Sequence, residues 1–422
     1  MTSLLRIFWL ETVALWRGWT AWMLLAASCG WIALLPRLVT GDGTQEGARD
    51  LCIRYGLGGV LALLVVSLAA AATGAIATER ETKRLQLTLV RPVSPFAVAW
   101  GKFLALAALG ALVLAAATLL VTATAPGEGG LCHHVHRPQM EPPRAEAEKM
   151  YDAYMEDPET PPEIKKAKKS VVLRILTQRA KDNYQTVQTN ETAEWTFAGF
   201  EKWRTEHPGV EPAVRFRFSN DFNMRDDVRG SLAANGLAGT VSNITQTAVT
   251  VPLRLGGAER EGDVLSFTNT GRASVMVRPR QDVELLFPAD AFAWNMFRAY
   301  VVMVSVLASV IAFGVFLGAG LSRPVALFTA IVMLAVSEMS PSVVDQYPDQ
   351  LERNRVDRVG LVISRAVSKC AKPVSDVAPL SALADGDCVE RRDALGAFAL
   401  DFLLVPLLLA ALSAVLLRRL QQ

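Results

Sequence analysis

Five long stretches of this chain contain almost no charged side chain, and no other feature limits its fold as strongly. They cover residues 18–36, 55–78, 103–126, 299–321 and 394–417. A helix of about 20 apolar residues crosses the roughly 30 Å of hydrocarbon in a bilayer, so each stretch predicts a membrane-spanning helix. A sixth stretch, over residues 324–344, qualifies if Glu338 lies near the membrane interface. We therefore expect a mainly α-helical polytopic membrane protein with six transmembrane helices.

Basic residues flank these stretches on one side if six helices cross the membrane. Arg and Lys are enriched in short cytoplasmic segments, so that side is expected to be cytoplasmic. The residues concerned are Arg6, Arg17, Arg80, Lys83, Arg84, Arg91, Lys102, Arg323, Arg418 and Arg419. Both termini then lie in the cytoplasm and the protein in the inner membrane. Residues 4–16 are expected either as an amphipathic interfacial helix or as an extension of the first span.

The charged residues concentrate in one insert between the third and fourth spans. Of the 84 charged residues, 45 lie between positions 128 and 290. This split predicts helices 1–3 in residues 1–126, an extracytoplasmic domain in 127–292, and helices 4–6 with an outer segment (345–392) in 293–422. The net charge of +2 indicates no basic surface of the kind that nucleic-acid binding requires.

Within the insert the pattern changes from helical to strand-like. Residues 144–182 form a polar, helix-favouring lead. After it, Val214, Phe216 and Phe218 alternate with arginines, which is typical of a half-buried strand. Further strands are expected over residues 248–255, 264–269, 274–278 and 283–287. We therefore predict an α+β domain that contains a β-sandwich of jelly-roll or immunoglobulin type.

A motif between the second and third predicted spans carries the functional prediction. Residues 79–94 read ERETKRLQLTLVRPVS, and a Gly-Lys pair at 101–102 begins the next span. Leucines from Leu85 to Leu89 form an apolar strip among charges, and Pro92 ends any helix before it. Such a helix on a cytoplasmic surface suits docking to another protein. A solvated loop of basic anchors is the alternative.

The order of these residues resembles the cytoplasmic turn of ABC-2 type transporter permeases. In that family E-R-E-x-G-T-L-x-x-L-L-x-x-P-V-S is followed by G-K at the start of a span. The matching residues are Glu79, Arg80, Glu81, Leu85, Leu89, Pro92, Val93, Ser94, Gly101 and Lys102. Lys83 and Arg84 stand where the family has Gly-Thr, and Thr88 replaces an apolar residue, so the docking contacts are expected to differ. The resemblance is tight over residues 79–102 and extends loosely to the six-span plan outside the insert.

The resemblance implies the permease subunit of an ABC exporter, which moves an unknown substrate across the cytoplasmic membrane. The residues implied in coupling to a separate ATPase subunit are Glu79, Arg80, Glu81, Leu85, Leu89 and Pro92. The chain itself has no phosphate-binding loop, because Phe96 stands where Gly101-Lys102 would need a preceding glycine. We therefore expect no enzyme and no cofactor in this chain, with ATP and Mg²⁺ bound by the partner. The family's assembly pairs two permeases, identical or different, with two ATPase subunits.

Two other functional classes stay open. In one, the ATPase cycle moves the outer domain against an envelope partner without transporting a substrate, so the protein is a mechanical transducer. In the other, the chain is a non-transporting membrane sensor or scaffold that presents a β-sandwich. An ATPase partner would separate the first two classes from the third.

Two acids are expected within or beside the bilayer, where a charge is costly and often functional. Glu338 and Asp401 both fall in the outer half of their predicted spans. They are predicted either as interfacial carboxylates or as a proton or cation relay.

The cysteines and histidines suggest two further features of the outer side. Cys132, His133, His134 and His136 follow the third span and combine ligands that suit copper or zinc, or else belong to a solvated loop. An oxidising exterior would allow disulfides Cys370–Cys388 and Cys52–Cys132. The sequence does not decide the connectivity.

Overall fold

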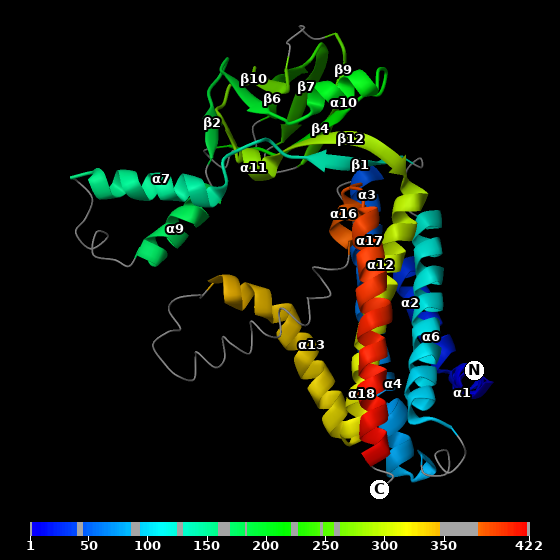
Figure 1. Ribbon diagram of the computed structural model, residues 1–422. Coiled ribbons are helices and arrows are strands. Elements are labelled where there is room, and N and C mark those ends of the chain that lie inside the picture. Colours follow the sequence, from blue (N-terminus) through cyan, green and yellow to red (C-terminus); the bar gives the residue numbers. More distant parts are fainter. Residues whose placement is uncertain are drawn as a thin grey trace. The chain divides into compact units, whose positions relative to one another are not determined.

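The computed structural model describes residues 2–39, 45–85, 93–124, 130–158, 169–181, 184–220, 227–244, 248–256, 262–346 and 379–419. The chain divides into two compact units (Figure 1). One, the helical unit, contains Met1–Leu131 and Asp290–Gln422. The other, the sheet unit, is Cys132–Ala289. The sheet unit falls within residues 127–292 of the predicted insert, whose extracytoplasmic position stays a prediction.

Five helices in the described part of the helical unit are long and apolar enough to cross a membrane. They are α2 (Thr20–Leu38), the continuous run α3–η1–α4 (Gln45–Leu51, Cys52–Leu57, Gly58–Glu81), α6 (Pro95–Thr124), α12 (Phe292–Gly320), and the run α17–η3–α18 (Arg391–Ala397, Phe398–Leu404, Val405–Arg419). The segments η1 and η3 are π-helical. The five long apolar stretches of the sequence thus correspond to five helices, as expected of a membrane protein. The sixth span stays a prediction: α13 (Arg323–Gln346) is helical, but only its part Arg323–Ser337 counts as an apolar helix, and that part is short.

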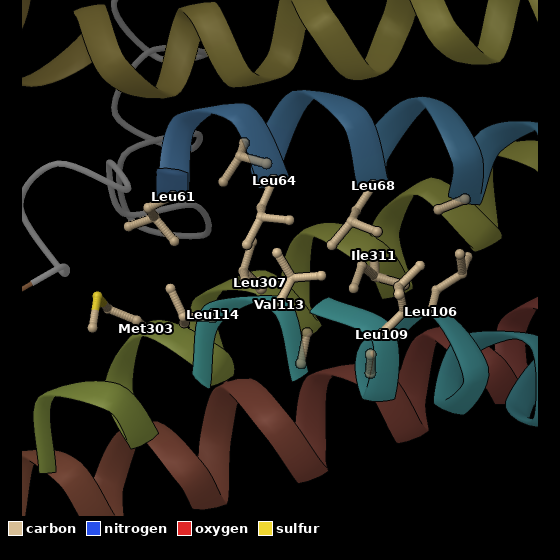
Figure 2. Close-up of a cluster of buried hydrophobic side chains, with 14 of the residues drawn as sticks. Leu61, Leu64, Leu68, Leu106, Leu109, Val113, Leu114, Met303, Leu307 and Ile311 are labelled. Carbon is tan, nitrogen blue, oxygen red and sulfur yellow. The ribbon is translucent and has the colours of Figure 1, made fainter. Parts of the chain in front are cut away.

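The core of the helical unit lies between α4, α6 and α12. Figure 2 shows leucines of α4 facing side chains of the other two helices. The buried residues labelled there are Leu61, Leu64, Leu68, Leu106, Leu109, Val113, Leu114, Met303, Leu307 and Ile311. Apolar side chains also cover much of the outside of the unit, for example Trp22 (55% exposed) and Phe328 (69% exposed). A lipid environment accepts such a surface, because lipid tails are as apolar as leucine.

Two glycines let α12 approach α4 closely. A Cβ atom on Gly314 would lie 2.7 Å from the Cβ of Ala72, and one on Gly318 would collide with the carbonyl oxygen of Thr73. The two glycines are four residues apart, which is the small-residue spacing that brings membrane helices together. This spacing is visible in the sequence, but the contact between α12 and α4 was not predicted from it.

The N-terminal segment forms a helix of its own, α1 (Thr2–Arg17), and not an extension of α2. The helices are separated at Gly18 and Trp19, and Trp19 takes a left-handed conformation with φ of 62°. Helix α1 packs against α6, where a Cβ on Gly101 would lie 2.8 Å from Cγ2 of Ile7. Of the two interpretations of residues 4–16, the separate helix is therefore confirmed.

The sheet unit contains three antiparallel sheets around one hydrophobic core. The first sheet has the strand order β1 (Leu131–His136), β12 (Val283–Ala291), β4 (Ala213–Phe216) and β8 (Val249–Pro252). The second has the order β3 (Thr192–Thr196), β10 (Val264–Asn269), β6 (Asp227–Ala234), β7 (Leu237–Ile244) and β9 (Arg254–Leu255). The third has the order β2 (Gln185–Val187), β11 (Val275–Val277) and β5 (Ser219–Asn220). Aromatic rings from β3, β4 and β10 meet in the core, where the centroids of Phe216 and Phe267 are 4.9 Å apart. The predicted strands are all found, and the β-rich character of the insert is confirmed.

The predicted helical lead forms two helices, α7 (Pro143–Glu156) and α9 (Lys169–Lys181). They pack on each other through a small cluster of Ala147, Val172 and Leu176. Two further short helices, α10 (Phe200–Glu206) and α11 (Pro279–Asp282), lie between strands. The sequence therefore predicted the change from helix to strand correctly.

Candidate functional site

The residues Glu79, Arg80 and Glu81 end helix α4, and each contacts a different part of the helical unit. Consecutive residues of an α-helix point about 100° apart, so three adjacent side chains reach three different neighbours. In this chain the neighbours are α6 for Glu79, α12 for Arg80 and α13 for Glu81. We call this place the Glu79 end of the helical unit.

Glu79 shares a buried ammonium group with a second carboxylate. The Nζ atom of Lys102, on α6, lies 2.8 Å from Oε1 of Glu79 and also contacts Oε1 of Glu11, on α1. The Lys102 side chain is only 4% exposed, whereas the two glutamates are about 30% exposed (30% and 29%). An ammonium group this deeply buried requires paired charges. Lys102 therefore ties three helices together.

Arg80 and Glu81 bind the ends of two further helices. Nη1 of Arg80 donates a hydrogen bond of 3.0 Å to the carbonyl oxygen of Ala319, in the last turn of α12. Oε1 of Glu81 accepts a hydrogen bond of 2.9 Å from the backbone N–H of Arg323, the first residue of α13. Helix ends leave such groups unpaired, and a cation at a C-terminus or an anion at an N-terminus also matches the helix dipole.

The chain turns sharply after α4. Lys83 has a left-handed φ of 61°, and its backbone N–H donates to the carbonyl oxygen of Arg80. Leu85 follows and is buried in the core of the helical unit, at 3% exposed. Leu85 was predicted to belong to an apolar strip that docks to another protein, whereas the turn folds its side chain back onto the helices of its own chain. Leu89 and Pro92 lie outside the described residues.

A cavity of about 230 Å³ opens beside Lys102. Glu11, Thr78, Lys102 and Arg323 line it, together with small apolar residues that include Ala70 and Ala105. The sequence analysis missed this cavity, since its wall combines residues from α1, α4, α6 and α13.

A second network of buried polar groups lies at the other end of α12. Arg298 is 5% exposed, forms an ion pair with Asp290, and donates a hydrogen bond of 2.9 Å to the carbonyl oxygen of Val389. One turn earlier, the fully buried Asn295 accepts a hydrogen bond from the backbone N–H of Val389 and donates one to the carbonyl oxygen of Asp387. These contacts hold the part of the predicted outer segment just before α17, and we call this place the Arg298 end.

The two predicted intramembrane acids differ in how far the structure describes them. Asp401 lies in the π-helical segment η3, where its backbone carbonyl oxygen accepts a hydrogen bond of 2.8 Å from the hydroxyl of Ser309 on α12. Glu338 falls within α13, and its side chain lies outside the described part of the structure. A relay that involves these two residues therefore stays a prediction.

The cysteine predictions are partly contradicted. Cys52 is a free thiol buried in η1, as Cys29 in α2 is a free thiol, so the predicted disulfide Cys52–Cys132 is wrong. Cys132 and Cys388 are each disulfide-bonded. Cys370, the predicted partner of Cys388, lies outside the described residues.

The predicted metal site is also contradicted. Residues 131–136 form strand β1, whose alternation sends His133 to the opposite face from Cys132, His134 and His136. The sulfur of Cys132 is used in a disulfide and cannot act as a thiolate ligand. Among the described residues, no group of three or more His, Cys, Asp or Glu side chains is placed to hold a metal ion.

Comparison with protein-family models, with curated proteins and with solved structures finds no match. The chemistry of the site is therefore inferred from its own side chains. At the Glu79 end these form one shared ion pair and two helix caps, which join five helices at the base of a single turn.

Proposed function

We propose that this chain is the permease subunit of an ABC-2 type exporter in the cytoplasmic membrane. The turn that follows α4 docks onto a separate ATPase subunit, and two permeases assemble with two ATPases. The observation that carries the proposal is the convergence of Glu79, Arg80 and Glu81. Their side chains contact α6, α12 and α13 directly at the base of the turn, and Lys102 of α6 links Glu79 to Glu11 of α1.

This convergence gives a physical route for coupling. A nucleotide-dependent partner can shift a conformational equilibrium only through groups that it contacts differently in its two states. A partner that grips the turn after Glu81 moves α4, and the ion pair at Lys102 and the caps at Ala319 and Arg323 carry that movement to the neighbouring helices. Packed helices transmit such shifts because they are not continuously deformable.

The conformation of the turn supports the family resemblance. Lys83 stands where the resembled pattern has glycine, and it takes the left-handed conformation that favours glycine. Gly101 leaves room for the side chain of Ile7 on α1, and Lys102 binds the carboxylates of Glu11 and Glu79. The Gly-Lys pair therefore has a role in packing α1. These roles follow from the same residues on which the resemblance rests.

The course of the chain supports six crossings with the Glu79 end in the cytoplasm. Arg323 begins α13 at the Glu79 end, whereas Asp387 and Val389 lie at the Arg298 end. The chain therefore travels the length of the helical unit between them, and the 24 residues of α13 reach about 36 Å as a helix. The disulfide-bonded Cys388 lies between Asp387 and Val389, and disulfides persist on the oxidising side of a membrane.

The test is capture of the ATPase from membranes with the full-length protein. Lys83 is exposed, and Lys83→Asp reverses its charge, while Asp tolerates a left-handed φ better than most residues. We expect the wild type to retain an ATPase with a phosphate-binding loop and Lys83→Asp to lose most of it. Lys83→Asn controls for the conformation, and Arg392→Asp, on exposed Arg392 beside the Arg298 end, controls for charge reversal elsewhere.

Three results would overturn the proposal. The first is a wild-type protein that captures no ATPase, and the second is a Lys83→Asp variant that captures as much ATPase as the wild type. The third is labelling of a Lys83→Cys variant from outside intact cells by a membrane-impermeant maleimide. In that case the turn would face away from any cytoplasmic ATPase.

A further inference from the structure

The cavity at the Glu79 end changes from charged to apolar along its length. Its charged and polar wall comprises Glu11, Thr78, Lys102 and Arg323. Ala70 lies eight residues before Thr78 on α4, which is about 12 Å further along the helix axis. Ala105 likewise lies one turn beyond Lys102 on α6. A phospholipid changes in the same order, from a charged headgroup to an acyl chain.

The charges around the cavity are arranged as a separated pair. Lys102 contacts Oε1 of both Glu11 and Glu79, so this triad carries one net negative charge, and no described donor contacts Oε2 of either glutamate. Arg323 lines the same cavity, and its guanidinium group forms no ion pair with any described side chain. The wall thus offers the Glu11 carboxylate of this negative triad and a positive guanidinium group to one ligand.

We propose that this cavity binds the headgroup of a phospholipid that carries both a phosphate and a primary ammonium group, as phosphatidylethanolamine does. Arg323 binds the phosphate, and the carboxylate of Glu11 accepts hydrogen bonds from the ammonium group. The cavity of about 230 Å³ is much larger than the ~10–15 Å³ that one water needs and smaller than the ~300–1,000 Å³ of pockets that hold whole drug-sized ligands, which suits a headgroup. The rest of each acyl chain stays in the bilayer.

The geometry distinguishes this headgroup from its two commonest relatives. The quaternary ammonium of phosphatidylcholine has no N–H group to donate to Glu11. Phosphatidylglycerol satisfies Arg323 but brings no cation to the negative triad. The inference depends on a membrane around the helical unit, and it does not depend on an ATPase partner.

The test uses the purified full-length chain in nanodiscs of phosphatidylcholine that contain equal, small fractions of phosphatidylethanolamine and phosphatidylglycerol. Native mass spectrometry counts the lipids retained after extraction into mild detergent. Relative to its mole fraction in the nanodisc, we expect phosphatidylethanolamine to be retained about tenfold over either competitor, as one additional charge-assisted hydrogen bond would give. Retention of the three lipids in proportion to their mole fractions, or preference for phosphatidylglycerol, would overturn the proposal.

Three variants locate the binding. Arg323→Gln and Glu11→Gln should each remove the preference, whereas Arg418→Gln, on the same end but outside the cavity lining, should keep it. Gly74→Leu fills the cavity without changing a charge, since a Cβ at Gly74 meets neighbours only at ordinary contact distances of 3.5 Å or more. We expect this variant to melt no lower than the wild type in pure phosphatidylcholine, and yet to lose the preference. A Gly74→Leu variant that is stably folded and keeps the full preference would show that the lipid binds elsewhere.

Discussion

The ammonium nitrogen of Lys102 lies 2.8 Å from a carboxylate oxygen of Glu79, although the two residues belong to different helices. Both residues belong to the motif that resembles the cytoplasmic turn of ABC-2 permeases, and their contact joins its two parts in this chain. Glu11 of α1 joins the same ammonium group. The motif therefore organises the chain's own helices, whatever partner it also contacts.

Replacing Lys102 by methionine should destabilise the helical unit strongly. The substitution leaves two partly buried carboxylates close together without a cation, and loss of one partner from a buried ion pair costs about 3–5 kcal/mol. Because Glu11 and Glu79 keep some solvent exposure, we expect the lower end of this range. Thermal unfolding in detergent, followed by tryptophan fluorescence, measures the change.

The matched control for this prediction neutralises the carboxylates as well. Adding Glu11→Gln and Glu79→Gln to Lys102→Met should restore much of the lost stability, since no uncompensated charge then remains. A triple variant that is less stable than Lys102→Met alone would contradict this explanation.

Replacing Gly318 by leucine should separate α12 from α4. The new Cβ atom would collide with the backbone carbonyl oxygen of Thr73, which cannot move without displacing α4. Overpacking of this kind costs about 1–3 kcal/mol, and we expect the upper end because the obstacle is backbone. Gly396→Ala is the control: nothing lies within 4 Å of a Cβ there, so stability should stay equal or rise.

Replacing Lys83 by glycine should stabilise the protein by about 1 kcal/mol, because a left-handed conformation costs a non-glycine residue about 1–2 kcal/mol. The comparison is Thr82→Gly, one residue earlier, where φ is −85° and the hydroxyl donates to the carbonyl oxygen of Thr78. Thr82→Gly should lower the melting temperature. Equal effects of the two substitutions would argue against the left-handed turn.

The stability of the sheet unit around His136 should fall as the pH drops below about 6.5. Partial burial against the ring of Phe287 lowers the pKa of His136, and the charge of His134 lowers it further. The unfolded chain therefore binds a proton between the lowered pKa and the ordinary value, so stability rises with pH through this window and is lost below it. Histidine hydrogen–deuterium exchange should give His136 a lower pKa in the folded protein than in a peptide of β1.

Alkylation of the denatured but unreduced protein should modify Cys29 and Cys52 and leave Cys132 and Cys388 unmodified. The first two are free thiols and the last two are disulfide-bonded. Peptide mass spectrometry before and after reduction identifies each site. Modification of Cys132 without reductant would contradict the structure.

The membrane helices were predictable because they depend on composition alone. A run of apolar residues needs no knowledge of its neighbours, and the stretch at 299–321 corresponds to α12 (Phe292–Gly320) within a turn or two. Alternation predicted β10 over Val264–Asn269 in the same way. The hairpin of β6 and β7 was missed, although Asn235-Gly236 is a strong turn signal and both residues have positive φ (43° and 73°).

The candidate site was not predictable in the same way. Whether Glu79 faces a partner protein or a lysine of α6 depends on how two helices are rotated about their axes, and a single sequence does not record this. Leu85 was placed on the surface because charged residues surround it in the sequence, whereas the turn at Lys83 returns it to the core. The resemblance located the motif, and the contacts had to come from the structure.

Helix α4 tolerates changes of residue type more readily than a change of length. Inserting or deleting one residue between Gly58 and Thr78 would rotate Glu79, Arg80 and Glu81 together by about 100° and shift them by about 1.5 Å along the axis. All three would then lose their partners at once. The face of α4 that contacts Gly314 and Gly318, at Ala72 and Thr73, would turn away as well. Related chains should accordingly vary in the composition of this helix while keeping its number of residues constant.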